Sequence, residues 1–122
     1  MDIVFEGEFT DLNRYIKALN NSRWGGASIK KIETERVYIC CKNQKVKSIK
    51  DYPVFVIFTW YSKNLKMDID NVAFAKKFIL DGLVKAKVLT NDSRKFVSGF
   101  TDYFEIDSGN PRVVVNIISH KK

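Results

Sequence analysis

The sequence predicts an α+β fold, in which about four strands form a small mixed sheet and helices pack on one side of it. A β-branched and aromatic run over residues 54–61 is followed by one helical pattern and then by two more strand-like runs. The chain has 122 residues and 45% hydrophobic content, which suits one compact core. We therefore expect a single domain over residues 1–122.

The first third of the chain predicts an edge strand followed by two helices. Residues 2–9 alternate imperfectly between apolar and polar, as an edge strand does. A short helix is expected over residues 11–19. Residues 20–27 contain an Asn-Asn and a Gly-Gly pair, which indicate a loop, and Ser28 can cap a second helix over residues 29–41.

The rest of the chain predicts the centre of the sheet. Residues 54–61 are expected to form a central strand that is buried on both faces. A long helix is expected over residues 71–87, and Gly82 inside it suggests close packing. Two strands over residues 95–106 and 112–119 flank a turn rich in Gly, Pro and Asn, which predicts a hairpin.

The charge of the chain points to a phosphate-rich partner. The formal net charge is +7 and the isoelectric point is about 9.4. Nucleic acid is the first candidate partner and an anionic membrane the second, while a solvated basic face without a partner is the alternative. No run approaches the ~20 apolar residues of a membrane span, so no spanning segment is expected. Because nucleic acid is the preferred partner, no membrane partner is predicted.

The N-terminus, the two cysteines and the single histidine limit the cellular compartment and the kinds of catalytic site that are expected. The N-terminus lacks the features of a signal peptide. Cys40 and Cys41 are adjacent and cannot build a disulfide framework, so we expect reduced thiols in a cytoplasmic protein. The only histidine is His120, which disfavours a zinc site and histidine-based catalysis.

Acidic residues gather around the long predicted helix of this basic chain. Asp68 and Asp70 precede the helix, and Asp92 follows it. If a strand beginning near Asp92 paired beside residues 54–61, these carboxylates would approach each other and could hold a Mg²⁺ ion. The alternative is that the three are ordinary loop and capping residues, and that Lys77 is a solvated helix residue.

Taken together, these residues resemble the RusA family of Holliday junction resolvases from phages and prophages. The family signature is D-x-D-N, then a helix with K-x-x-x-D-x-L, then an aspartate about eleven residues further on. Here these positions are Asp68 to Asn71, Lys77 to Leu83, and Asp92, which follows Asp81 by 92 − 81 = 11 residues. The N-terminal Leu12 to Tyr15 and the C-terminal strands are similar to the Gram-positive phage branch.

The resemblance implies a RusA-like fold and a metal-dependent endodeoxyribonuclease. Asp68, Asp70 and Asp92 would be the catalytic, metal-binding carboxylates, and Lys77 the functional helix lysine. The cofactor would be Mg²⁺, with Mn²⁺ as a possible substitute, and no small-molecule cofactor is implied. The protein would act as a homodimer in the cytoplasm of a bacterial host and nick opposed strands of branched DNA.

The chain departs from the family pattern in its spacing and its basic residues. The interval from Asn71 to Lys77 is longer than in the shortest family members, so Lys76 is an alternative for the active-site lysine. Asn91 replaces the first residue of an Asp-Asp pair, and the arginine run before the first aspartate is reduced to Lys66-Met67.

Several basic residues are expected to border the site and contact DNA phosphates. They are Arg14, Arg23, Lys30, Lys31, Lys63, Lys66 and Lys76. Trp24 either stacks at the centre of a junction or anchors its own loop. Two other functions remain open: a DNA-binding protein or phage regulator that keeps the fold without catalysis, and a protein-binding accessory factor.

Overall fold

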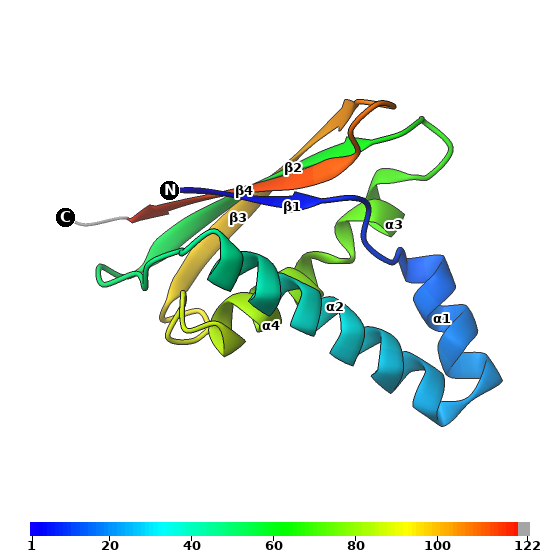
Figure 1. Cartoon of the computed structure of the whole chain (residues 1–122), viewed down its shortest axis with the longest axis horizontal. Helices are drawn as coiled ribbons and strands as arrows, with labels where there is room; N and C mark the ends of the chain where they lie inside the picture. Colours follow the sequence, from blue (N-terminus) through cyan, green and yellow to red (C-terminus); the bar gives the residue numbers. More distant parts are fainter. Residues whose placement is uncertain (120–122) are drawn as a thin grey trace.

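The protein is described by a computed structural model that covers residues 1–119, apart from the side chain of Arg23. Two helices follow each of the first two strands, the last two elements are strands, and the helices lie on one side of a single sheet (Figure 1). The elements are β1 (Asp2–Glu6), α1 (Leu12–Asn21), α2 (Arg23–Asn43), β2 (Val54–Ser62), α3 (Ile69–Ala73), α4 (Lys76–Lys85), β3 (Val97–Ile106) and β4 (Arg112–Ser119). The predicted fold class, a four-stranded mixed sheet with helices on one side, is confirmed.

The sheet has the strand order β1-β4-β2-β3. β2 runs parallel to β3 and antiparallel to β4, and β4 also pairs antiparallel with β1. The predicted hairpin between β3 and β4 is therefore wrong, because β2 lies between them. A direct hairpin would have left the strongly apolar β2 nearer an edge, whereas the observed order places it between two neighbours.

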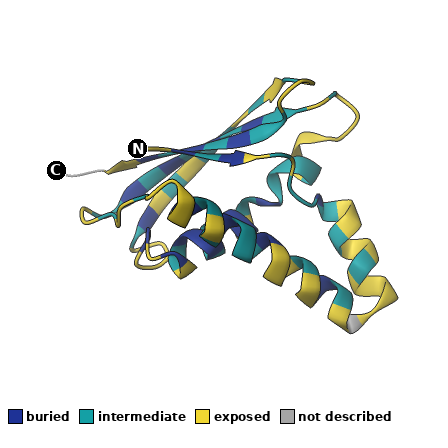
Figure 2. Cartoon of the chain, viewed as in Figure 1, coloured by how far each residue is buried: buried dark blue, intermediate teal, exposed yellow. Residues whose placement is uncertain are grey.

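β2 is central as predicted, but it is not buried on both faces. Val56, Phe58 and Trp60 point toward the helices and are buried, whereas Phe55 and Ile57 on the other face are only partly covered. Figure 2 shows that buried residues concentrate where the sheet meets α2 and α4. One helical layer leaves the opposite face of the sheet open, so the apolar run reflects strand propensity on that face more than burial.

The predicted loop over residues 20–27 is mostly helical. Only Ser22 separates α1 from α2, and its hydroxyl accepts a hydrogen bond from Trp24 N at 3.1 Å. A Cβ added at Gly25 would lie 2.6 Å from the carbonyl oxygen of Ala18. The glycine pair thus allows two helices to meet at a tight corner. Trp24 is 67% exposed there and does not serve as a buried anchor.

The helix predicted over residues 71–87 is divided into α3 and α4 by a break at residues 74–75. Ala75, Ile79 and Leu83 are buried, at helical spacing. Gly82 packs closely as expected, because an added Cβ would lie 2.4 Å from the Cβ of Val37 on α2. Within the described residues, no helix combines the length and apolar character needed to cross a membrane.

Candidate functional site

The loop after β2 presents two exposed carboxylates at the start of α3. Asp68 is the N-cap residue of α3, with extended backbone angles, and Asp70 lies in its first turn. The Asp68 side chain makes no capping hydrogen bond. Neither carboxylate takes part in a hydrogen bond or ion pair with another described residue. Both are therefore free to accept a cation.

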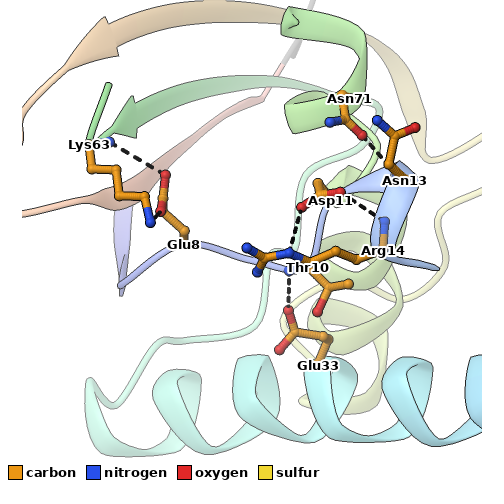
Figure 3. A network of polar contacts seen from close by, with 8 residues as sticks. All are labelled: Glu8, Thr10, Asp11, Asn13, Arg14, Glu33, Lys63 and Asn71. Atoms are coloured by element: carbon orange, nitrogen blue, oxygen red, sulfur yellow. Dashed lines mark hydrogen bonds and ion pairs between the residues drawn. The ribbon is translucent and has the colours of Figure 1, made fainter. Parts of the chain in front are cut away.

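Asn71, the fourth residue of the D-x-D-N sequence, ties α3 to α1. Its Oδ1 accepts a hydrogen bond from Asn13 N at 2.9 Å (Figure 3). Tyr15 of α1 also packs on Phe74 just after α3, with ring centroids 5.2 Å apart. The N-terminal helix thus braces the turn that carries Asp68 and Asp70.

A buried carboxylate stands behind this turn. The side chain of Asp11 is only 4% exposed, and its Oδ1 accepts the Arg14 backbone N–H at 2.9 Å as the N-cap of α1. Its Oδ2 lies 3.3 Å from Arg14 Nε. Asp11 also lines a cavity of about 30 Å³, together with Trp60 and Val72. Because a buried carboxylate needs a compensating charge, much of the Arg14 charge is committed to Asp11.

Lys77 lies between two carboxylates from different segments. Its Nζ is 3.1 Å from Asp81 Oδ1, one helical turn away, and 3.6 Å from Asp92 Oδ2. Lys30 of α2 lies 3.9 Å from the other oxygen of Asp81. The hydrogen bond from Lys77 to Asp81, aided by the charges of Asp81 and Asp92, raises the pKa of Lys77. Lys77 is therefore a cation at neutral pH and cannot act as a base.

Lys76 points in a different direction, toward the sheet. Its Nζ pairs with Asp102 Oδ2 at 2.5 Å, and the other oxygen of Asp102 accepts the Trp60 indole N–H at 2.9 Å. The ammonium also lies 3.9 Å from the centroid of the Phe100 ring. Adjacent helical residues are rotated by about 100°, which separates the two lysines. Of the pair, Lys77 is the one that contacts a predicted catalytic carboxylate.

The three predicted metal ligands do not gather in one place. A strand after Asp92 does pair beside β2, but the pairing is parallel, with Val54 opposite Val97. Asp68 follows the C-terminal end of β2, whereas Asp92 precedes the N-terminal end of β3, so the two loops leave opposite ends of the sheet. Among residues 1–119 no group of three or more His, Cys, Asp or Glu side chains is arranged to hold a metal ion. Joint metal binding by Asp68, Asp70 and Asp92 stays a prediction.

The donors that are free still suit magnesium. Mg²⁺ is commonly bound by one or two carboxylates, with water and substrate phosphate oxygens completing its shell. Asp68 and Asp70 are two such carboxylates, exposed and two residues apart. Asp92 is instead engaged by Lys77. The residues present therefore fit an ion held by Asp68 and Asp70.

Most of the predicted DNA-binding cations already face carboxylates. Lys63 lies 3.9 Å from Glu8 Oε1, and Lys30 contacts Asp81. The pairs of Arg14 with Asp11 and of Lys76 with Asp102 follow the same pattern. Lys31 and Lys66 have exposed side chains without an ion pair to another described residue. The side chain of Arg23 lies outside the described part of the structure.

A second basic region lies at the other end of the sheet. We define the lysine surface as Lys42, Lys45, Lys47, Lys50, Lys85 and Lys87, all of which are exposed. Two hydrogen bonds join the segments that carry them: Ile49 N donates to Val88 O at 2.8 Å, and Ser48 Oγ donates to Lys87 O at 2.5 Å. Lys42 and Lys85 lie on the same ring, Tyr38, each 5.4 Å from its centroid.

A hollow of about 580 Å³ opens within the lysine surface. Lys50, Lys87, Ser48, Tyr52 and Thr90 are among its lining residues. Lys45, Lys47, Lys50 and Lys87 form no ion pair with a described residue, so their charge is uncompensated. Exposed ammonium groups around such a hollow suit a chain of phosphates.

The sequence alone indicates only one of the two segments that form the lysine surface. Residues 42–50 are rich in lysine, but nothing in the sequence pattern places Lys85 and Lys87 beside them. Asp102 and Asp11 were missed for the same reason, since each acquires its meaning from a partner distant in space or from burial.

The comparisons with known proteins add no relatives. No protein-family model matches the chain, and no curated protein matches it. The likeness to the RusA family therefore rests on the motif residues themselves, and membership of that family stays a prediction.

Proposed function

We propose that this protein is a Mg²⁺-dependent endodeoxyribonuclease that acts as a homodimer on branched DNA, with the four-way Holliday junction as its substrate. The observation that carries the proposal is the Lys77 ammonium, held beside Asp92 on the helix that follows Asp68 and Asp70. Two free carboxylates on α3 and a held ammonium on α4, in a chain of net charge +7, are groups that phosphodiester hydrolysis uses. Its place would be the cytoplasm of a bacterial host, as a phage or prophage product.

Each group has a distinct task in this proposal. Mg²⁺ bound at Asp68 and Asp70 would supply Lewis-acid activation of the phosphate and of water. Lys77 offsets negative charge on the scissile phosphate, and Asp81 keeps the ammonium oriented. The lysine surface holds the sugar-phosphate backbone of a DNA arm and gives affinity without sequence selection.

One observation favours a second candidate, a structure-selective DNA-binding protein or phage regulator without catalysis. Asp92 is paired with Lys77, and the three predicted ligands are not gathered. A protein that kept the basic surface but lost the metal site would look similar.

Cleavage of a synthetic four-way junction separates the two candidates. The full-length protein is incubated with the junction in Mg²⁺, in Mn²⁺ and in EDTA, with linear duplex of the same sequence as control. We expect paired nicks in the junction with either metal, and none in EDTA or in the duplex. Junction binding without cleavage in either metal would favour the regulator, and equal binding of junction and duplex would contradict selectivity for branches.

A further inference from the structure

The connection from β2 to α3 carries aliphatic side chains that the fold leaves in the open. Leu65 is 86% exposed and Ile69 is 60% exposed, and Met67 between them is also exposed. Ile69 follows Asp68 and precedes Asp70, so apolar and charged residues alternate along this segment. Exposed apolar residues that are grouped and bordered by charges mark a surface that is covered when the protein works.

These residues line a hollow together with the end of β3. Phe104 and Ile106 line it from the sheet, and Ile106 is itself 49% exposed. Phe104 lies opposite Trp60 of β2, on the face of the sheet that the helices cover. The segment before α3 runs past the C-terminal end of β2 (Figure 1). The hollow therefore opens at the end of the sheet where Asp68 and Asp70 stand.

The size and lining of the hollow suit a flat ring system. Its volume is about 330 Å³, at the lower end of the range of about 300–1,000 Å³ that is usual for ligand pockets. The hydroxyl of Ser62, another lining residue, forms no hydrogen bond with a described residue. Asn64 Oδ1 accepts a hydrogen bond from Lys66 N at 3.0 Å, which holds the side chain and leaves its amide N–H groups available. A nucleobase has apolar faces and a hydrogen-bonding edge, and so matches both kinds of lining.

The position of the hollow indicates which base enters it. Ile69, which lines the hollow, is flanked by Asp68 and Asp70, the proposed metal ligands. A phosphate held there by Mg²⁺ has the base of an adjoining nucleotide within reach of Ile69. Lys66, exposed and without an ion pair to a described residue, can contact a neighbouring phosphate. Leu, Ile and Met are among the side chains that proteins use to unstack bases in DNA.

We propose that this hollow takes one unstacked nucleobase from the strand that is cut, with Phe104 as its stacking partner and Leu65 and Ile69 as its walls. Unstacking costs least where a base has already lost neighbours, as at the centre of a four-way junction. The hollow thereby selects branched over linear DNA, which phosphate contacts at the lysine surface cannot do. The inference rests on the proposed function, because it takes Asp68 and Asp70 as the place of the scissile phosphate.

The fluorescence of aminopurine, an adenine analogue that brightens when it is unstacked, tests the site. A four-way junction carries the analogue at its branch point, and the full-length protein is added in EDTA so that no strand is cut. We expect the natural protein to raise the fluorescence severalfold. It should also bind the junction about tenfold more tightly than a linear duplex, since one base gains a stacking partner.

The combined variant Leu65→Gln and Ile69→Gln changes two exposed walls of the hollow. It should abolish the fluorescence rise and reduce the preference for the junction by about tenfold, because the unstacked base loses its apolar contacts. Affinity for the linear duplex should not change, since the phosphate contacts remain. Ile32→Gln with Ile39→Gln is the matched control: these exposed isoleucines line a separate apolar hollow on α2, and their replacement should leave both signals intact.

The possible results separate the base site from the proposed function. A junction that is bound while its aminopurine stays stacked, or an unchanged junction preference in the variant of Leu65 and Ile69, would overturn the base site. A protein that unstacks the base but cuts in neither Mg²⁺ nor Mn²⁺ would keep the base site and lose the nuclease. Light scattering without DNA covers another occupant, a second copy of the chain. If the same variant turns a dimer into a monomer with the fluorescence rise intact, the hollow belongs to the subunit interface and the base site is wrong.

Discussion

The two ends of the parallel β2–β3 pair differ in what they offer to a ligand. At the C-terminal end of β2, two free carboxylates stand on a braced turn, and the cations nearby are largely paired with acids. At the N-terminal end, Lys50 and Lys87, which form no ion pair with a described residue, line an open hollow. A parallel pair requires a connection that runs the length of the strands. Residues 63–96 therefore deliver Asp68 and Asp70 to one end and Lys85 and Lys87 to the other, a polarity that the net charge of +7 conceals.

The acidic end should carry the chemistry. Asp70→Asn should lower the single-turnover cleavage rate by about a thousandfold, because a metal ligand is lost. Junction affinity should stay the same or increase, since repulsion of phosphate is reduced. Glu6→Gln, which removes an exposed carboxylate elsewhere, serves as control and should cleave normally. Activity of Asp70→Asn near that of the natural protein would remove Asp70 from the site.

Substitution of Lys77 should mainly affect the cleavage rate, whereas substitution of Lys76 should mainly affect the free energy of unfolding. Lys77→Ala should slow cleavage by about 10- to 100-fold, since a cation near the phosphate is lost, while unfolding in urea changes little because its side chain is 60% exposed. Lys76→Ala should lower the free energy of unfolding by about 1–3 kcal/mol, because Asp102 is left partly buried without its partner. A stable Lys76→Ala that cleaves slowly, beside a normal Lys77→Ala, would reverse the assignment.

The basic end should supply affinity alone. Replacing Lys50 and Lys87 with Gln should weaken duplex binding by about tenfold and lower the slope of log affinity against log salt by about one to two units. Lys17→Gln, at an exposed lysine outside both the lysine surface and the predicted DNA contacts, provides the control variant, and the losses are compared per charge removed. Fluorescence anisotropy over a salt series measures both effects. Equal losses per charge in the two variants would mean that only net charge matters.

The smallest expected effect is an unchanged pH profile. Because the pKa of Lys77 is raised, its charge is fully present below the ordinary lysine value and is lost only as pH rises through the raised pKa. Between pH 6 and 9 the cleavage profiles of the natural protein and of Lys77→Arg should therefore have the same shape. A rate that falls toward pH 9 in the natural protein but not in Lys77→Arg would contradict the held ammonium.

Local sequence patterns predicted the positions of most helices and strands well, but they predicted the pairing of the strands poorly. The buried residues of α4 followed from helical spacing, and Gly82 marked a true close approach to Val37. The β3–β4 hairpin was predicted wrongly because the turn residues after residue 106 suggested direct pairing, whereas β2 lies between the two strands. The break before α4 has no proline to announce it.

The site was predictable to the extent that it is local in sequence. The i, i+4 spacing of Lys77 and Asp81 is visible in the sequence, and so is the i, i+2 spacing of Asp68 and Asp70. The pairing of Lys76 with Asp102 and the joining of residues 48–49 to residues 87–88 depend on folding, and no periodicity encodes them.

The D-x-D-N sequence combines residues with two separate roles: its aspartates are the proposed metal ligands, and Asn71 holds α3 to α1. Its amide oxygen accepts a hydrogen bond from the backbone N–H of Asn13 on another helix. The asparagine of the motif therefore supports the fold and has no part in the proposed reaction. A variant that has lost catalysis can still retain the asparagine, because its selection pressure is stability. In a genome search, the aspartates would distinguish active from inactive descendants, whereas the asparagine would identify only their shared architecture.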